Sequence, residues 1–281
     1  SEKLSSYIDG RQRSLKVLYY FKAKHPGLSG ARHLGVKLAK GDILSFLDDD
    51  VIISETWADT VLSNFENDKN VHVTGGPCLP YFETSIPFWF WKLNTEIDNG
   101  WFNPWYSLID FPKDIIDCPP DFIFGLNLSI RKKTLIDLKG FNPDLVPLDR
   151  QMFQGDGETG LSYKLKKSFL RSDFLCGALV YHQVGIDRLT IEYVQKRAYY
   201  QGVCDSFFDL RELSKLSQLY KKTFVHARHI LFKIYNKFSD KKSLNTVHHY
   251  SSGYYFHQNQ YYNSEIVRNW VHLDNYFDEQ C

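Results

Sequence analysis

Cysteine is scarce in this sequence, and its spacing excludes the usual covalent frameworks. The 281 residues include five cysteines, none in a C-x-x-C pair, namely Cys78, Cys118, Cys176, Cys204 and Cys281. An odd number without close pairs argues against a disulfide scaffold and against a cysteine-ligated zinc site. We therefore expect the protein to work in a reducing compartment.

Long hydrophobic runs and a strong net charge are also missing. No apolar run reaches the roughly 18 residues needed to span a bilayer, and no signal peptide is recognisable. The chain has 34 basic and 33 acidic residues, a formal net charge of +1. No overall basic field would gather a polyanion, so we expect no nucleic acid partner. These features predict a cytoplasmic protein.

Methionine is nearly absent. The chain begins at Ser1, and its one methionine is Met152. Two interpretations stay open at this point: the initiator methionine was removed, or the sequence is part of a longer protein.

Hydrophobic and aromatic residues are plentiful. The hydrophobic fraction is 43% and the aromatic fraction is 16%. A chain of this length can bury a sizeable core, so one large domain, or a domain with an appendage, is expected. Aromatic rings suit sugar faces and membrane interfaces as well as cores, and we assign most of them to the core.

The hydrophobic pattern predicts alternating helices and strands. Residues 28–40 have helical spacing, 42–47 form a short buried strand, Ser54 caps a helix that ends near Phe65, and 71–74 form a second strand. This order predicts an α/β protein with a largely parallel sheet. An irregular insert should fill 80–120. Further strands are expected at 122–131 and 174–182, and further helices at 132–138, 157–168, 190–201 (ended by Gly202) and 210–237.

Three consecutive carboxylates follow the first buried strand. Asp48, Asp49 and Asp50 would repel one another there, and a bound cation removes that conflict. Mg²⁺ and Mn²⁺ prefer carboxylate oxygens and keep coordination sites open for phosphate. Ligands of open α/β sheets bind beside strand ends. The run therefore predicts a metal–diphosphate site, and the alternative is a solvated acidic turn that caps the next helix.

Four segments together resemble the family 2 glycosyltransferases of the GT-A fold. Residues 30–50 (GARHLGVKLAKGDILSFLDDD) are similar to the family's A-R-N-x-G helix, A-x-G-[DE] turn and F-L-D-D-D strand, with His33 in place of the usual Asn. Three later segments match in the family's order: 125–131 (GLNLSIR) with 138–142 (LKGFN), 155–165 (GDGETGLSYKL), and 180–184 (VYHQV). The resemblance covers about residues 27–202.

The resemblance implies a fold and a reaction. It implies a GT-A-like open mixed sheet flanked by helices in residues 1–205, with a helical, aromatic-rich C-terminal extension in residues 206–281. Family members transfer a sugar from a nucleoside diphosphate sugar to a glycan or lipid-linked acceptor, usually with inversion, as in polysaccharide biosynthesis. The cofactor is Mn²⁺ or Mg²⁺, and family habits suggest a peripheral place at the inner face of the membrane.

The resemblance also implies site residues. Asp48 and Asp50 are the outer residues of a D-x-D motif, with Asp50 on the metal and Asp48 or Asp49 near the ribose or the metal's waters. His182 would complete the metal shell, or it is a half-buried histidine bonded to the backbone. Arg32 would bind the diphosphate or nucleotide, or it is a surface arginine.

Two carboxylates compete for the role of general base. By the register of 155–165, Glu158 occupies the position of the family's catalytic Asp. Asp156 is the second candidate, at the expected start of a helix, where the helix dipole would lower its basicity. The alternative for both residues is an N-terminal helix charge or cap.

One part of the family's pattern is missing. The first strand with its V-I-P-T-Y-N-like segment and the strand ending in V-D-D-G-S are not found, so we expect an N-terminally incomplete catalytic domain. A non-catalytic glycan- or nucleotide-binding protein is the alternative, and a nucleotidyltransferase is a third interpretation. Residues 215–242 mix basic and apolar side chains, which indicates either contact with an anionic membrane or a solvated helix packed on the core.

Overall fold

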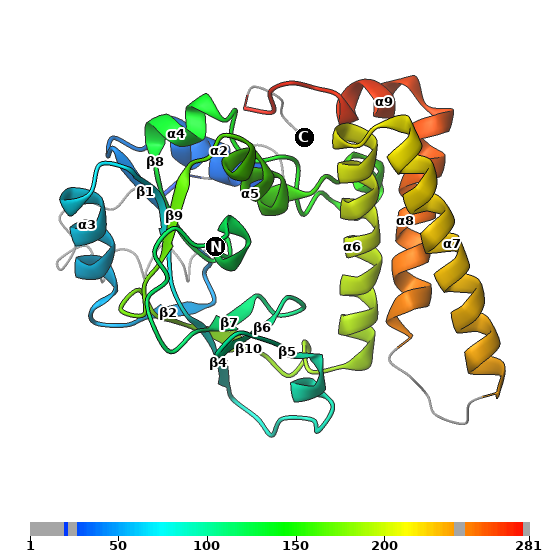
Figure 1. The fold of residues 1–281 in the computed structure, drawn as a ribbon, viewed down its shortest axis with the longest axis horizontal. Coiled ribbons are helices and arrows are strands. Elements are labelled where there is room, and N and C mark those ends of the chain that lie inside the picture. The colour runs from blue at the N-terminus through cyan, green and yellow to red at the C-terminus, as the bar shows by residue number, and fades with distance from the viewer. Residues whose placement is uncertain (1–19, 22–26, 239–244, 278–281) are drawn as a thin grey trace.

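The computed structural model describes residues 20–21, 27–238 and 245–277. Two β-sheets with flanking helices form one part, and a group of helices forms the other (Figure 1). The expected class is confirmed: an α/β protein with mixed sheets, flanking helices and a helical C-terminal region.

The first sheet has the strand order β1-β8-β3-β9. Its strands are β1 (Ile43–Leu47), β3 (Val71–Gly75), β8 (Asn127–Arg131) and β9 (Arg171–Phe174). β8 is antiparallel to both β1 and β3, whereas β3 and β9 are parallel. The accompanying helices are α2 (Leu28–Leu38), α3 (Trp57–Asn67), α4 (Lys132–Asp137) and α5 (Gly157–Lys167).

The second sheet has the strand order β2-β10-β4-β7-β6-β5. Its strands are β2 (Val51–Ile53), β4 (Cys78–Phe82), β5 (Thr95–Ile97), β6 (Gly100–Asn103), β7 (Leu108–Asp110) and β10 (Val180–Val184). Short 3-10 helices lie at η1 (Phe90–Leu93), η2 (Pro120–Phe122) and η3 (Leu148–Phe153).

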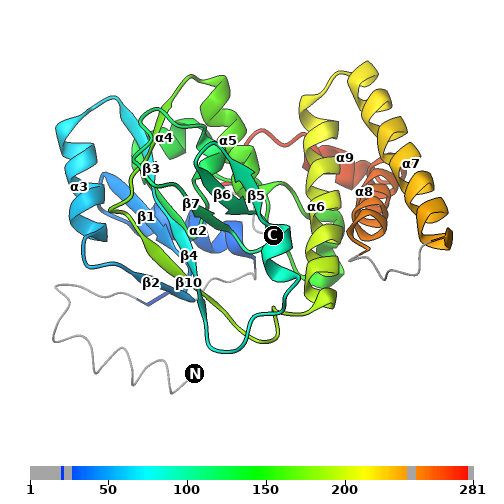
Figure 2. The ribbon, with the colours of Figure 1, turned by 60° about the horizontal axis from the view of Figure 1, so that its bottom comes forward.

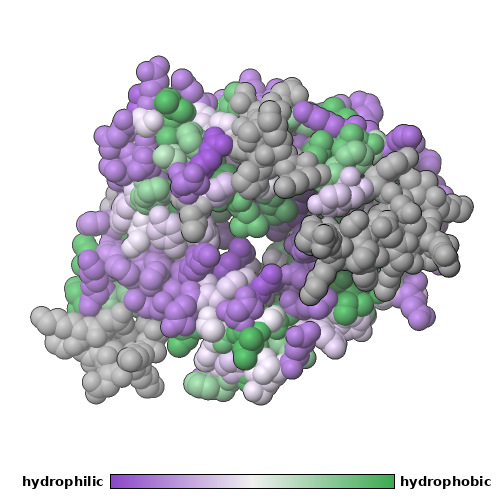
Figure 3. All heavy atoms as spheres, turned by 180° about the vertical axis from the view of Figure 1, so that it is seen from behind, coloured by the Kyte–Doolittle hydropathy of each residue, from purple (hydrophilic) through white to green (hydrophobic). Residues whose placement is uncertain are grey.

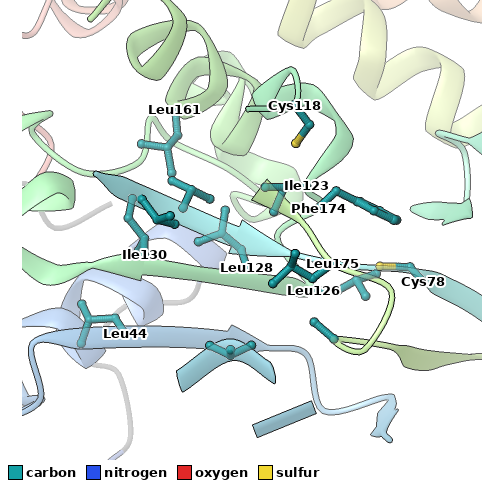
Figure 4. Packing of buried hydrophobic residues seen from close by; sticks show 14 of the residues in the cluster. Leu44, Cys78, Cys118, Ile123, Leu126, Leu128, Ile130, Leu161, Phe174 and Leu175 are labelled. Carbon is teal, nitrogen blue, oxygen red and sulfur yellow. The ribbon is translucent and has the colours of Figure 1, made fainter. Parts of the chain in front are cut away.

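The main core lies on both sides of the first sheet. Leu44 of β1 is paired in register with Ile130 of β8, and Leu161 of α5 belongs to the same buried cluster (Figure 4). Asn127, at the start of β8, ties the sheets together from a buried position. It accepts a hydrogen bond from Trp57 Nε1 at 2.8 Å and donates one to the carbonyl of Ala178 at 2.8 Å.

The C-terminal helices pack side by side, and α7 is the outermost (Figures 1 and 2). They are α6 (Ile191–Glu212), α7 (Lys215–Phe238), α8 (Thr246–Asn263) and α9 (Glu265–Val271). Within the described residues, no helix is both long enough and apolar enough to cross a membrane.

Several local expectations were wrong. Only two of the eight strand pairs of the described residues are parallel, so the sheets are not largely parallel. The insert 80–120 is not irregular, because it contains β5, β6 and β7. The strand expected at 174–182 is two strands joined by a turn, and the strand expected at 122–131 begins only at Asn127.

Two helix ends also differ from the prediction. Gly202 does not end a helix, because α6 continues to Glu212. A Cβ at Gly202 would collide with the Tyr250 carbonyl of α8, so this glycine permits the close crossing of two helices. Ser54 does not cap α3; Thr56 precedes the helix, and the Ser54 hydroxyl contacts the Gly177 carbonyl.

The expected boundary between residues 205 and 206 stays a prediction. Helix α6 runs through that position without interruption. Four cysteines, Cys78, Cys118, Cys176 and Cys204, are free thiols, and Cys281 lies outside the described residues.

Candidate functional site

The acidic run forms the turn between β1 and β2. β1 ends at Leu47 and β2 begins at Val51, so the three aspartates stand where the chain passes from one sheet to the other. Asp48 and Asp50 line a cavity of about 420 Å³, whereas Asp49 is exposed and forms no ion pair with a described residue. Figure 3 shows the molecule hollowed near its middle.

Asp50 is partly satisfied by a neighbouring cation. Its Oδ2 lies 2.8 Å from Arg188 Nη2 and 3.4 Å from His182 Nε2. Its Oδ1 is buried and has no hydrogen-bond partner among the described residues. A buried carboxylate oxygen without a partner is costly, and a bound cation would satisfy it.

The hydrogen bonds of His182 determine its tautomer. Nδ1 lies 2.8 Å from the Tyr106 carbonyl, which can only accept, so Nδ1 carries the proton. In the neutral ring, Nε2 then holds a lone pair, and Arg188 Nη1 lies 3.0 Å from it. A histidine whose Nδ1–H is held by a carbonyl, with Nε2 facing a carboxylate, has the arrangement of a metal ligand.

The predicted ligands thus fit a divalent cation in part. Asp48, Asp50 and His182 share one cavity, and the unpartnered oxygen of Asp50 faces no donor. As the side chains stand, no group of three or more His, Cys, Asp or Glu residues in the described part of the chain could hold a metal ion. Arg188 supplies the positive charge between Asp50 and His182.

Arg32 joins the acidic turn to Glu158, the first candidate for the general base. Its guanidinium lies 3.5 Å from Asp48 Oδ1 and 3.6 Å from Glu158 Oε2, and its side chain is 7% exposed. Burial raises the pKa of both Asp48 and Glu158, and the charge of Arg32 opposes that rise. Arg32 is therefore a buried bridge between two carboxylates, not a surface arginine.

The two candidate bases lie in different surroundings. Glu158, in the first turn of α5, accepts a hydrogen bond from the Gly125 N–H at 2.8 Å and belongs to the Arg32–Asp48 chain. Asp156 precedes α5 and is 5% exposed, and Asn142 Nδ2 donates to it at 2.6 Å. Neither carboxylate lines either of the two cavities described here, but Glu158 reaches them through Arg32 and Asp48, whereas Asp156 forms no such link.

The expected effect of the helix dipole on Asp156 was wrong in direction. Burial raises the pKa of Asp156 to about 6, although Asn142 and Lys164 act in the opposite sense. Desolvation outweighs the helix terminus, because this carboxyl group is almost completely removed from water.

A second cavity of about 480 Å³ lies between α2 and β1. Arg32, Val36 and Leu44 are among its lining residues. Asp48 borders this cavity as well as the one at Asp50, so it stands between the two.

Sequence reasoning missed the cationic side of the cavity beside Asp50. Arg188 lies six residues after His182, and Tyr193, Lys196 and Arg197 follow on α6. Their spacing on a helix was visible, but nothing in the sequence showed which face of that helix meets the acidic turn.

Comparison with known proteins supports the family. Residues 1–118 match the family model described as glycosyl transferase family 2. This part of the chain includes Arg32 and the acidic turn. The resemblance stated from the motifs is thus confirmed over residues 1–118, which include the first of its four segments, as family 2 glycosyltransferase sequence.

Individual relatives are distant. The glucosyl-dolichyl phosphate glucuronosyltransferase of Haloferax volcanii is 27% identical over 74 residues, which are 26% of this chain and 24% of the relative. The chain thus matches about a quarter of that relative's length.

Two solved structures are distantly similar to this chain. GalNAc-T7, crystallised with UDP, GalNAc and Mn²⁺, has a TM-score of 0.46 and 18% identity, and the similarity covers 79% of this chain and 45% of that one. TarS 1–349 of S. aureus in complex with UDP-GlcNAc has a TM-score of 0.40 and 12% identity, covering 93% of this chain and 79% of that one.

Proposed function

We propose that this chain is the catalytic part of a glycosyltransferase that moves a sugar from a nucleoside diphosphate sugar to a carbohydrate or lipid-linked acceptor. One observation carries the proposal: Asp48 borders two cavities and is linked through Arg32 to Glu158. A diphosphate bound at Asp48 has one cavity for its nucleoside and another for its sugar and the acceptor.

The nucleoside is assigned to the cavity between α2 and β1. Its walls include the apolar side chains Val36 and Leu44, which suit a base, and Arg32, which can pair with phosphate oxygens. The exposed Asp49 is the remaining candidate for the ribose or for the waters of a metal. The sugar and the acceptor are assigned to the cavity beside Asp50.

A divalent ion, Mn²⁺ or Mg²⁺, is assigned to Asp48, Asp50 and His182. The unpartnered Oδ1 of Asp50 supports this assignment, and His182 Nε2 would bind the ion in place of the hydrogen bond that it accepts from Arg188 Nη1. When bound, the ion would act as a Lewis acid that neutralises the departing diphosphate. Arg188, beside Asp50, is placed to share that task through its guanidinium.

Glu158 is the proposed general base. It accepts the proton of the acceptor hydroxyl as that oxygen bonds to the anomeric carbon. The bond between this carbon and the diphosphate oxygen breaks, the diphosphate leaves with the electron pair, and the configuration inverts. Burial raises the pKa of Glu158, which makes its carboxylate a stronger proton acceptor. Asp156 is assigned a structural role, because it is buried against Asn142.

For the acceptor and the location, the proposal names only a class of acceptor and a face of the membrane. The name of the Haloferax volcanii relative specifies a dolichyl phosphate substrate, which supports a lipid-linked acceptor and glycan or polysaccharide synthesis. Such an acceptor is reached by a protein at the inner face of the membrane. Residues 1–205 would carry the chemistry, and residues 206–281 would form the extension.

Binding of nucleoside diphosphates tests the donor site directly. UDP, GDP and dTDP, with CMP for comparison, are titrated calorimetrically into the wild-type chain with and without Mn²⁺. We expect one diphosphate to bind in a Mn²⁺-dependent manner. Asp50→Ala should lose this binding, whereas Asp59→Asn, an exposed carboxylate change on α3, should keep it.

The outcomes separate the candidate functions. Absence of diphosphate binding by folded wild-type protein would contradict the proposal. Binding without release of diphosphate from any nucleotide sugar, even with acceptor present, would instead indicate a non-catalytic binding protein. Equal diphosphate binding with and without Mn²⁺ would support the donor site and contradict the assignment of a metal to it.

A further inference from the structure

Helix α6 presents a cationic face to the cavity beside Asp50. Tyr193, Lys196, Arg197 and Tyr200 recur at intervals of three and four residues, which places them on one side of the helix. All four line the cavity of about 420 Å³ that Asp48 and Asp50 also line. The cavity therefore has an acidic wall and a basic wall.

The two cations of this face have no carboxylate partner. Within the described residues, neither Lys196 nor Arg197 forms an ion pair, whereas Arg188 is already paired with Asp50. Arg197 Nε is buried without a hydrogen-bond partner. A buried guanidinium N–H that lacks an acceptor is a binding element for an anionic oxygen.

We infer that Lys196 and Arg197 bind an anionic group of the acceptor, a phosphate or a sugar carboxylate. This inference rests on the proposed function, because the donor diphosphate is assigned to the acidic wall. An anion bound at the basic wall then belongs to the other substrate. Trp105 lines the same cavity and is a candidate for stacking on a sugar ring. Tyr193 and Tyr200 also line it, but Tyr193 is stacked on Tyr106, and Lys196 Nζ lies 5.9 Å from the centroid of the Tyr200 ring.

Binding of small probes tests this subsite without turnover. Glucose 1-phosphate, methyl glucuronide and neutral methyl glucoside are compared by saturation-transfer NMR on the full chain. The anionic probes should bind at least about tenfold more tightly than the neutral one. Whichever anionic probe binds better identifies phosphate or carboxylate as the recognised group.

Variants locate the binding. The double variant Lys196→Gln/Arg197→Gln should lose this preference and keep the affinity for the donor diphosphate within about twofold. Lys113→Gln, an exposed lysine outside both cavities, is the matched control. Equal binding of charged and neutral probes, or an unchanged preference in the double variant, overturns the inference. Loss of diphosphate affinity in that variant also overturns it, because the basic wall would then hold the donor. Failure of the wild type to bind any diphosphate contradicts the proposed function separately.

A different observation, on the far side of the helical group, carries a second inference. The outer face of α7 is apolar and exposed. Its residues at helical spacing are Leu216, Leu219, Tyr220, Phe224, Ile230, Leu231 and Ile234, with exposed fractions from 43% to 78%. Val225, on the opposite side of the helix, is 2% exposed and packs inward. The helix therefore does not turn its main apolar stripe to the core.

The charge of α7 indicates what covers this stripe. Residues 215–238 contain six basic and no acidic residues, namely Lys215, Lys221, Lys222, Arg228, Lys233 and Lys237. The whole chain has a net charge of only +1, so positive charge is concentrated on this helix. An apolar stripe with basic flanks matches an anionic lipid surface, where the stripe enters the interface and the bases meet the headgroups.

The geometry points to α7 as a helix that lies in the surface of an anionic membrane. Vesicles of phosphatidylcholine, with or without about 30% phosphatidylglycerol, test this by co-sedimentation of the full chain. We expect binding to the anionic vesicles only, weakened by salt. The change Leu219→Ser/Leu231→Ser should reduce the bound fraction about tenfold or more.

A matched surface change controls for loss of apolar area. Phe169→Ser/Ile266→Ser alters two exposed apolar residues outside α7 and should leave vesicle binding unchanged. Absent binding, equal binding to neutral and anionic vesicles, or an unaffected α7 variant overturns the inference. A dimer in light scattering that dissociates in the α7 variant also overturns it, because the stripe would then bind a second copy.

Discussion

Replacing Asp156 by asparagine should stabilise the protein at neutral pH. Burial raises the pKa of this carboxyl group from 3.8 to about 6. Each pKa unit corresponds to about 1.4 kcal/mol, so keeping Asp156 ionised costs the folded state up to about 3 kcal/mol at pH 7. Asparagine has the same shape without the charge, and its oxygen can still accept from Asn142.

The pH dependence identifies the cause. A folded pKa above the unfolded value means that the folded state binds the proton more tightly, so stability is lost as pH rises from about 4 through about 6. Asp156→Asn removes this loss. In urea denaturation followed by circular dichroism, the variant should exceed the wild type by about 1–3 kcal/mol at pH 7.5 and match it near pH 4.

Asp173 provides a control of opposite sign. Burial alone would raise the pKa of Asp173, but hydrogen bonds from Arg171, the Asp117 N–H and Asn64 lower it overall. Asp173→Asn should therefore destabilise the protein at pH 7.5. The reasoning is refuted if Asp156→Asn is less stable than the wild type at pH 7.5, or if its gain is the same at both pH values.

Three further changes test the site and its support. Glu158→Gln should reduce the rate of diphosphate release from the nucleotide sugar by about 10²-fold or more and retain the affinity for diphosphate. Asp156→Asn should stay active. A loss of activity in Asp156→Asn as large as that in Glu158→Gln would contradict the assignment of Glu158 alone as general base. Gly125→Ala should also reduce turnover, because the added methyl overlaps the Glu158 carboxylate; unchanged kinetics would show that this contact is dispensable. Asn127→Leu removes the acceptor of the Trp57 indole N–H and should lower the free energy of unfolding by about 2–4 kcal/mol in urea titrations; a loss below about 0.5 kcal/mol would contradict its tying role.

The sequence predicted best those features that depend on local pattern. The helix that became α2, the strand β1 and the acidic turn after it were all expected, because helical spacing and a short apolar run ending in aspartates are local signals. That Asp48 and Glu158 belong to one site was predicted only from the resemblance to the family's motifs. Their bridge through Arg32 became visible in the structure.

The features that were missed depend on contacts between distant segments. Gly202 has the sequence signature of a helix end, but its position is set by the backbone of α8. Arg188 has no motif of its own, and its role comes from the pairing of β10 with β2, which brings the segment after β10 beside Asp50. The raised pKa of Asp156 likewise depends on burial, which a helix-start pattern does not reveal.

The close crossing of α6 and α8 at two glycines has a consequence for the separation between the cavity and the membrane. Gly202 lies against the Tyr250 carbonyl, and Gly253 of α8 lies against the Tyr199 carbonyl, so a side chain added at either position would push the two helices apart. Helix α6 borders the cavity, and α8 supports α7. With α7 in a lipid surface, this joint acts as a rigid spacer that sets the height of the cavity above the bilayer. A larger residue at either glycine would then change which length of acceptor reaches the site, without altering any side chain that binds it.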